Sequence, residues 1–187
     1  MNEAHLRLCS SPEWATFVER ELLPWALAGT ELGDHVLEIG PGPGLTTDVL
    51  RASVPRLTAV ENDDVLAARL GRRLEESNVQ VVCADGSQLP FGSDRFSAAT
   101  LFTMLHHVAS APRQDQLLAE LCRVLRPGGI VVGTDSIETP TRRELHKGDV
   151  YVPVDPAGFE ARLSTCGFVA VVVEEEEDRF RFLARAP

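Results

Sequence analysis

The chain has 187 residues, an apolar fraction of 44%, a formal net charge of −10 and four cysteines. This length is sufficient for one domain with its own hydrophobic core, and the composition excludes a disordered or fibrous protein. The acidic balance argues against binding of nucleic acid through phosphate contacts and favours a small or cationic ligand.

The four cysteines lie far apart in the sequence and form no C-x-x-C pair. We therefore predict reduced thiols in the core, and neither a redox motif nor a metal site. The sequence shows no signal peptide and no run of eighteen apolar residues. These features favour a cytoplasmic protein that does not enter a membrane.

The first predicted helix begins near Ser10 and Ser11, because serine caps helix N-termini and the following Pro12 is tolerated in the first turn. Apolar residues at helical spacing then form one face, and Pro24 is expected to kink or end the helix. The residues of this face are Trp14, Phe17, Val18, Leu22 and Trp25.

An apolar strand over residues 36–39 runs directly into three glycines spaced two apart, Gly40, Gly42 and Gly44. Glycine has no Cβ, so the backbone of such a turn can approach a ligand closely. The spacing differs from the G-x-G-x-x-G fingerprint of dinucleotide-binding folds, and an acid, Glu38, precedes the glycines by two residues.

A short helix over residues 47–52 and a strand over residues 56–61 complete a βαβ unit. Because such crossovers are right-handed, Glu61 at the carboxyl end of the second strand is expected beside the glycine turn. Doubly wound folds place an acid there that accepts hydrogen bonds from ribose hydroxyls. Glu61 could instead cap the next helix, although Asp63 can fill that role.

Helices and strands continue to alternate along the chain, which indicates an α/β fold with a Rossmann-like doubly wound sheet of seven strands. The sheet is expected to be mostly parallel, with an antiparallel strand in a C-terminal hairpin. The remaining helices are predicted over residues 63–76, 112–125 and 156–166, and the remaining strands over 79–84, 96–102, 130–134, 168–173 and 180–184.

The glycine turn with Glu38 resembles motif I of the class I S-adenosylmethionine-dependent methyltransferases. Asp85, after the third strand, matches the acid that receives the adenine amino group in that family. The Leu-His-His segment at residues 105–107 is similar to that of the ubiquinone and menaquinone biosynthesis group, methyltransferase type 11. The Pro-Gly-Gly break at residues 127–129 also follows the family pattern. Ser97 departs from it, since the family commonly carries an acid there, and we expect a structural effect because the residue begins a strand.

The resemblance implies a single methyltransferase domain over residues 1–187. Its cofactor would be S-adenosylmethionine, with S-adenosylhomocysteine as product. The methyl group would pass by in-line displacement to an O, N or C nucleophile of a small-molecule acceptor. Residues 1–30 would form a helical arm or lid, and the polar stretch 136–155 is the candidate substrate loop, although it could also be a mobile surface connection. The protein could be a monomer or a homodimer.

The site residues that the resemblance implies fall into three groups. The expected cofactor-binding residues are Glu38, Gly40, Pro41, Gly42, Gly44, Glu61, Asn62, Asp85, Gly86, Phe102 and Thr103. The candidate substrate-binding residues are Trp14, Met104, His107, His146 and Tyr151. His106 is the candidate general base, because the pKa of imidazole lies near neutrality. Either histidine of the adjacent pair could instead bond to backbone or pack in the core.

Three other functions remain open at this point. An NAD-dependent oxidoreductase shares the βαβ unit, but the glycine spacing disfavours it. A related enzyme could use bound S-adenosylmethionine for cyclisation or another rearrangement. A non-enzymatic scaffold is disfavoured by the intact glycines and acids.

Overall fold

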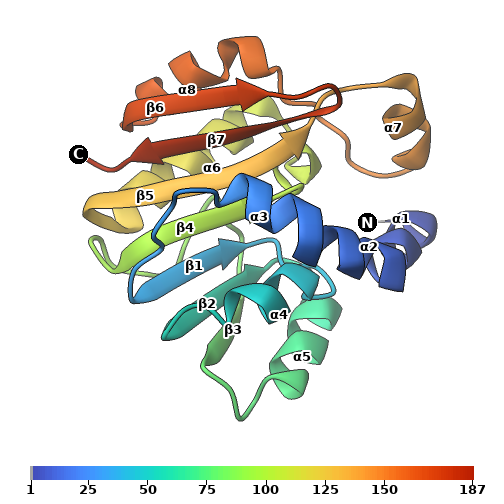
Figure 1. Ribbon diagram of the computed structural model, residues 1–187, viewed down its shortest axis with the longest axis horizontal. Helices are drawn as coiled ribbons and strands as arrows, with labels where there is room; N and C mark the ends of the chain where they lie inside the picture. Colours follow the sequence, from blue (N-terminus) through green and yellow to red (C-terminus); the bar gives the residue numbers. More distant parts are fainter. Residues whose placement is uncertain (1) are drawn as a thin grey trace.

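The computed structural model describes residues 2–187, which form one seven-stranded sheet with helices on both faces (Figure 1). The strand order is β3-β2-β1-β4-β5-β7-β6, and β7 is antiparallel to both of its neighbours. The predicted fold class is therefore confirmed. The strands are β1 (His35–Ile39), β2 (Arg56–Glu61), β3 (Val79–Cys83), β4 (Phe96–Phe102), β5 (Leu125–Ser136), β6 (Val169–Glu175) and β7 (Arg179–Arg185).

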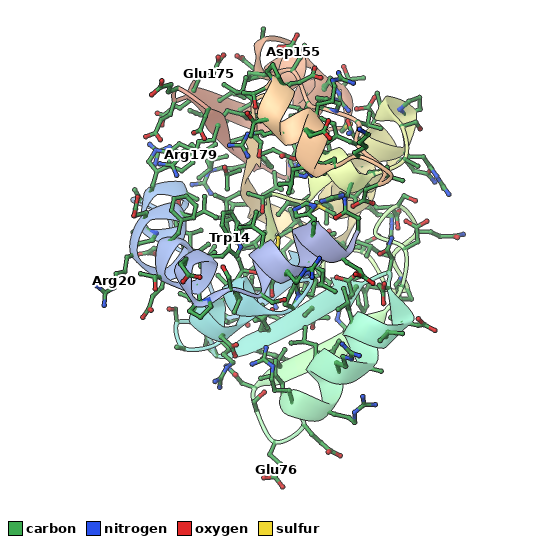
Figure 2. The ribbon with its side chains drawn as sticks, turned by 90° about the vertical axis from the view of Figure 1, so that its right-hand side faces the viewer. Trp14, Arg20, Glu76, Asp155, Glu175 and Arg179 are labelled. Carbon is green, nitrogen blue, oxygen red and sulfur yellow. The ribbon has the colours of Figure 1, made fainter. Side chains whose placement is uncertain are left out.

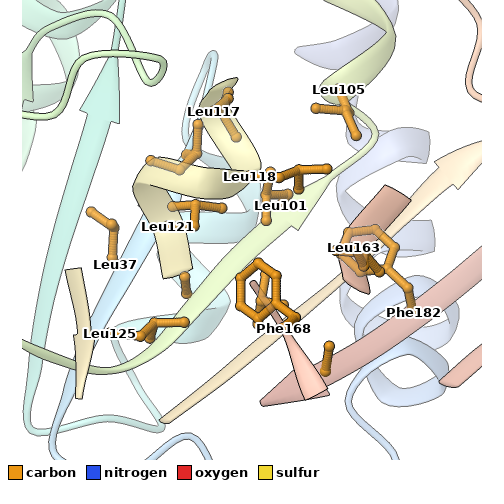
Figure 3. Packing of buried hydrophobic residues seen from close by; sticks show 14 of the residues in the cluster. Leu37, Leu101, Leu105, Leu117, Leu118, Leu121, Leu125, Leu163, Phe168 and Phe182 are labelled. Carbon is orange, nitrogen blue, oxygen red and sulfur yellow. The ribbon is translucent and has the colours of Figure 1, made fainter. Parts of the chain in front are cut away.

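The helices separate into two layers. The N-terminal helices and α4 pack on one face of the sheet, and α6 and α8 bury a large apolar cluster on the other (Figures 1 and 3). The helices are α1 (Glu3–Cys9), α2 (Pro12–Phe17), α3 (Leu23–Ala26), α4 (Leu45–Leu50), α5 (Asp64–Arg73), α6 (Ala111–Val124), α7 (Pro140–Leu145) and α8 (Phe159–Thr165), with shorter turns η1 (Val18–Leu22), η2 (Leu105–His107) and η3 (Pro156–Gly158).

The central strands are apolar on both faces because helices cover both sides. All five residues of β1 are buried, and Leu37 and Leu101 on β1 and β4 pack below Leu117, Leu118 and Leu121 of α6 (Figure 3). Burial of this kind contributes about 25 cal/mol per Å² of apolar surface, which makes it the main source of stability. The two buried glutamates, Glu38 and Glu61, lie near the carboxyl ends of β1 and β2.

The N-terminal segment is more divided than the single predicted helix. A π-helical turn, η1, separates α2 from α3, because Pro24 in the first turn of α3 has no backbone N–H to continue the α-helical pattern. Helix α1, which lies before the predicted start, was missed. The Trp25 ring stacks against the guanidinium groups of Arg179 and Arg181 on β7, and Arg181 also donates a hydrogen bond to the Trp25 carbonyl oxygen.

Two other segments differ from expectation. Strand β5 begins at Leu125 rather than Ile130, because Leu125 pairs with Phe96 and the Pro-Gly-Gly run forms an irregularity inside the strand. The stretch 136–155 contains α7, which was not predicted; Thr139 caps it by accepting a hydrogen bond from the Arg142 N–H.

Ser97 has the structural role expected of it. Its hydroxyl accepts a hydrogen bond from the His35 N–H at 3.0 Å and lies 2.7 Å from the Leu32 carbonyl oxygen, to which it donates. The Ser97 side chain also lies against Gly33, which has a positive φ and leaves no room for a Cβ of its own. Ser97 therefore joins the segment before β1 to β4, at the end of the sheet opposite the glycine turn.

The four cysteines are free, but the expectation of core thiols is wrong for Cys83, which is exposed at the end of β3. The other three are partly buried. Within residues 2–187, no helix has the length and apolar character needed to cross a bilayer.

Candidate functional site

A cavity of about 410 Å³ lies at the carboxyl ends of the parallel strands. The glycine turn and the segments after β2, β3 and β4 form most of its wall, and residues of the N-terminal helices close one side. Figure 2 faces this end of the molecule and shows Trp14 near its middle, whereas Arg20, Glu76 and Glu175 lie at the periphery. The site is therefore where open α/β sheets bind their ligands.

Most of the predicted site residues line this cavity, and five do not. The predicted residues in its wall are Trp14, Gly40, Pro41, Gly42, Glu61, Asn62, Asp85, Gly86, Phe102, Thr103, Met104 and His107. The predicted residues outside its wall are Glu38, Gly44, His106, His146 and Tyr151.

The glycine turn requires glycine on conformational grounds. Gly40, Gly42 and Gly44 have φ angles of 66°, 54° and 91°, in the left-handed region that side chains disfavour. A Cβ atom on Gly40 would also lie 3.0 Å from the side chain of Met104 in the cavity wall. Gly44 caps α4 and lies outside the wall. The turn therefore presents bare backbone to the cavity through Gly40 and Gly42.

Glu38 holds this turn together from behind. Its carboxylate accepts hydrogen bonds from the hydroxyls of Thr46 and Thr47, the latter at 2.7 Å, and only 1% of the residue is exposed. Burial raises the pKa of Glu38 to about 7 against the opposing effect of these hydrogen bonds. The structure thus uses Glu38 to fix the start of α4, and Thr46 rather than Glu38 reaches the cavity.

Glu61 lies beside the glycine turn, where the crossover argument places it. One carboxylate oxygen accepts a hydrogen bond from the Gly42 N–H at 2.9 Å, and the other accepts one from the Asp63 N–H at 3.0 Å. Asp63 itself caps α5. Glu61 is therefore held rigidly in the wall, and helix capping falls to Asp63.

Asp85 is fixed by the turn that follows β3. Its carboxylate accepts hydrogen bonds from the N–H and hydroxyl of Ser87 at 2.8 and 2.7 Å, and these bonds lower the pKa of Asp85. The guanidinium of Arg113 lies 3.7 Å away. Ser87 and Arg113 both line the cavity and were not predicted, because neither belongs to a recognisable motif.

The cavity wall also includes His5 and Cys9 of α1 and Asp149 of the stretch 136–155, which the sequence did not indicate. Asn2, which precedes α1, joins this helix to the stretch 136–155. Its backbone N–H donates to the Asp149 carboxylate at 3.0 Å, and its side-chain amide donates to the Leu145 carbonyl oxygen at 2.9 Å. Helix α1 and the stretch 136–155 therefore meet beside the cavity, although they are far apart in the chain.

His106 lies behind the cavity wall rather than in it. Its Nδ1 is 2.5 Å from the Asp135 carboxylate, and both residues are fully or almost fully buried. Burial raises the pKa of Asp135, but the charge and hydrogen bonds of His106 outweigh this and hold the pKa below its usual value. The His146 ring stacks on Tyr151 with centroids 4.2 Å apart, and its Nε2 lies 3.2 Å from Nε2 of His106.

Burial also lowers the pKa values of the histidines nearest the cavity. It lowers the pKa of His5 to about 4 and that of His107 to about 3, and neighbouring imidazoles add to the effect. The pKa of His146 is lowered for the same primary reason. These rings are therefore neutral near pH 7 and offer lone pairs.

Comparisons with known proteins agree with this arrangement. The model of a family described as a methyltransferase domain matches residues 37–133, just over half of the chain. A demethylmenaquinone methyltransferase of Clavibacter sepedonicus is 33% identical over 141 residues, covering 74% of this chain and 54% of the relative. An O-methyltransferase, cnsE, of Penicillium expansum is 31% identical over 110 residues, covering 56% and 39%. The chain thus spans about half the length of the curated relatives it matches, or less.

Solved structures share the fold at low sequence identity. An S-adenosylmethionine-dependent methyltransferase from Aquifex aeolicus superposes with a TM-score of 0.78 at 16% identity, with full coverage of both chains. A phosphoethanolamine N-methyltransferase from Haemonchus contortus gives 0.75 at 14% identity, covering all of this chain and 60% of that one. Together with the family match, these findings show that the chain belongs to the methyltransferase domain family.

Proposed function

We propose that this domain transfers a methyl group from S-adenosylmethionine to a small-molecule acceptor. The observation that carries the proposal is the convergence of the glycine turn, Glu61 and Asp85 on one cavity. The volume of about 410 Å³ is within the range of small-molecule sites. The names of the relatives support the same activity.

The residues present fit this cofactor. Gly40 and Gly42 would lie against its methionine and ribose portions, because their backbone is not shielded by a Cβ. Glu61 would accept hydrogen bonds from the ribose hydroxyls, and Asp85 would orient the adenine amino group. When bound, S-adenosylmethionine supplies a methyl carbon activated by the positive charge of its sulfonium.

The acceptor would occupy the part of the cavity bounded by Trp14, Met104 and His107. These side chains offer apolar and aromatic surface with one imidazole, which suits a small aromatic or quinol-like metabolite. Menaquinone and ubiquinone methyltransferases among the relatives support that class. Displacement at an activated carbon gains most of its rate from positioning, which a rigid wall provides.

We propose a positioning role for His106 in place of the predicted base. Its backbone N–H donates to the Asp135 carboxylate at 3.1 Å, and its carbonyl oxygen accepts from the Val152 N–H at 2.8 Å. These bonds fix the turn that carries His107 into the wall. The structural contacts of His146 and Tyr151 favour the same supporting role for those two residues.

Calorimetric titration with S-adenosylhomocysteine, S-adenosylmethionine and NAD tests the cofactor. We expect micromolar binding of the first two and none of NAD. Glu61→Gln and Asp85→Asn should each weaken S-adenosylhomocysteine binding about tenfold, the loss of one charge-assisted hydrogen bond. Asp64→Asn, an exposed residue of α5, is the matched control and should bind as the unaltered protein does.

Incubation with S-adenosylmethionine and a panel of quinols, phenols and amines tests the reaction. The expected product gains the mass of one methylene unit, with stoichiometric release of S-adenosylhomocysteine. Binding of NAD without S-adenosylhomocysteine would disprove the cofactor assignment. Conversion of a substrate without a change in mass would instead indicate a rearrangement that uses the same bound cofactor.

A further inference from the structure

Four imidazole rings lie together beside the acceptor side of the cavity, the part bounded by Trp14, Met104 and His107. His5 comes from α1, His106 and His107 from η2, and His146 directly follows α7. The centroid of the His146 ring lies 4.5 Å from that of His5, 4.9 Å from that of His106 and 5.1 Å from that of His107. Figure 1 shows α1 and α7 beyond the same end of the sheet. This histidine cluster, His5, His106, His107 and His146, is assembled from three separate segments.

The hydrogen-bond acceptors next to His106 and His146 show which nitrogen of each ring carries the hydrogen. Nδ1 of His106 faces the Asp135 carboxylate, and Nδ1 of His146 faces the Arg142 carbonyl oxygen at 2.6 Å. Carboxylate and carbonyl oxygens only accept hydrogen bonds, so each Nδ1 carries the hydrogen. The Nε2 atoms of the two rings face each other at 3.2 Å and share one hydrogen bond, whose donor depends on which ring carries the proton. A metal ion bound to Nε2 of His146 would take the place of this hydrogen bond, since Nδ1 already donates to the Arg142 carbonyl oxygen.

The other two rings also present nitrogen atoms without partners. Nδ1 of His5 and Nε2 of His107 are buried and have no hydrogen-bond partner among the described residues. His5 as a whole is only 7% exposed. A buried polar atom left without a hydrogen bond is destabilising, so two such nitrogen atoms close together point to a bound ligand.

We propose that His5, His107 and His146 bind a divalent first-row transition-metal ion, with Zn²⁺ the best fit. One nitrogen from each ring belongs to a group whose atoms all lie within 4.8 Å of one another. Nitrogen ligands of a tetrahedral Zn²⁺ site lie about 3.4 Å apart, so closure requires side-chain shifts of roughly 1 Å. Imidazole ligands favour zinc, copper, iron and nickel over magnesium or calcium.

The surroundings support such a site. The Asp149 carboxylate lies 4.0 Å from Nδ1 of both His5 and His107, which adds negative charge next to the ion. The hydrogen bond of His146 to Arg142 orients a ligand ring through its other nitrogen, as outer partners of metal ligands commonly do. His5 and His107 line the cavity, so the ion would lie at its wall and link α1 to η2. Binding of the metal ion by these three histidines does not require the proposed methyl transfer.

Titration of the untagged chain with Co²⁺ tests the proposal directly. We expect one equivalent to bind with the visible absorption of a tetrahedral ion and without a thiolate charge-transfer band, although Cys9 lies nearby. Zn²⁺ should displace it and raise the midpoint of thermal unfolding. These measurements use the unaltered chain and do not depend on whether a variant folds.

Variants then locate the site. His5→Gln, His107→Gln and His146→Gln should each weaken binding about 100-fold, with folding checked by circular dichroism. His35→Gln is the matched control, because His35 lies in β1 beside Thr58 and should leave the affinity unchanged. The proposal would be overturned by absence of the tetrahedral spectrum, by a thiolate band, or by three cluster variants that bind Co²⁺ as tightly as the unaltered protein.

Discussion

The two sides of the cavity are built in different ways. The side proposed to hold the cofactor consists of residues at or just after the carboxyl ends of β1, β2 and β3. Its acidic side chains are held by hydrogen bonds to residues two to nineteen positions away, as Asp85 is by Ser87 and Glu61 by Gly42. The acceptor side joins α1, η2 and the stretch 136–155, so its contacts span up to 147 residues. In the proposed function, local strand-end geometry would position the cofactor, whereas packing between distant segments would shape the acceptor site.

The largest expected effect lies on the acceptor side. Asp135→Ala should lower the free energy of unfolding by about 3 kcal/mol, because it leaves His106 buried without its carboxylate. Affinity for S-adenosylhomocysteine should change by less than about threefold if the two sides are independent. Urea denaturation and calorimetry measure both quantities.

Asp178→Ala is the control for this change, since its ion pair with Arg142 is exposed and worth less than about 1 kcal/mol. An Asp135→Ala variant that lost cofactor affinity and stability together would show that the two sides are one unit.

On the cofactor side, Gly40→Ala should reduce S-adenosylhomocysteine affinity by roughly 100-fold. The residue has a φ of 66°, and a Cβ would lie 3.0 Å from Met104 in the wall. Isothermal calorimetry measures the loss. Gly92→Ala is the matched control, because a Cβ there meets no atom within 4 Å; similar affinities for the two variants would refute the close approach of backbone to ligand.

Glu38, behind the glycine turn, makes the stability of the protein depend on pH. Its pKa in the folded protein is about 7, above the ordinary value of 4.5, so between these values the folded state binds more protons than the unfolded state. Stability from this residue is present below about pH 4.5 and is lost as the pH rises through 7. Denaturation of Glu38→Gln should show a flatter decline between pH 5 and 8, whereas the exposed Glu75→Gln should follow the unaltered protein.

The smallest effect is expected at the far end of the sheet. Ser97→Ala removes the hydrogen bonds to Leu32 and His35 and should cost about 1 kcal/mol of stability. It should alter neither cofactor affinity nor acceptor turnover, because the residue lies away from both sides of the cavity. A change in cofactor affinity would show that this end of β4 is coupled to the site.

The same division explains what the sequence could predict. The seven strands, Glu61 and the glycine turn follow from periodicity and crossover handedness, which are local properties. The supporting role of Glu38 required knowledge of where Thr46 and Thr47 point. Helix α7 was missed because six residues leave little periodic signal.

The histidine cluster is the clearest limit of sequence reasoning. His5 and His146 are 141 positions apart, and no ligand spacing joins them, so the absence of a metal motif was a weak argument. Only the packing of α1 against the stretch 136–155 brings these rings together. A short helix such as α1 gains its place from that contact rather than from its own propensity.

The stacking of Trp25 against Arg179 and Arg181 has a consequence for the order of folding. Ribosomes release the N-terminal helices first, but the surface on which Trp25 packs does not exist until β7 has been made. The Trp25 contact therefore forms only after β7 has been made, whereas the apolar face of the N-terminal helices packs on β1, β4 and α4, which are made earlier. The contact of the N-terminal helices with the completed sheet is therefore made in two stages, first on the central strands and last on β7.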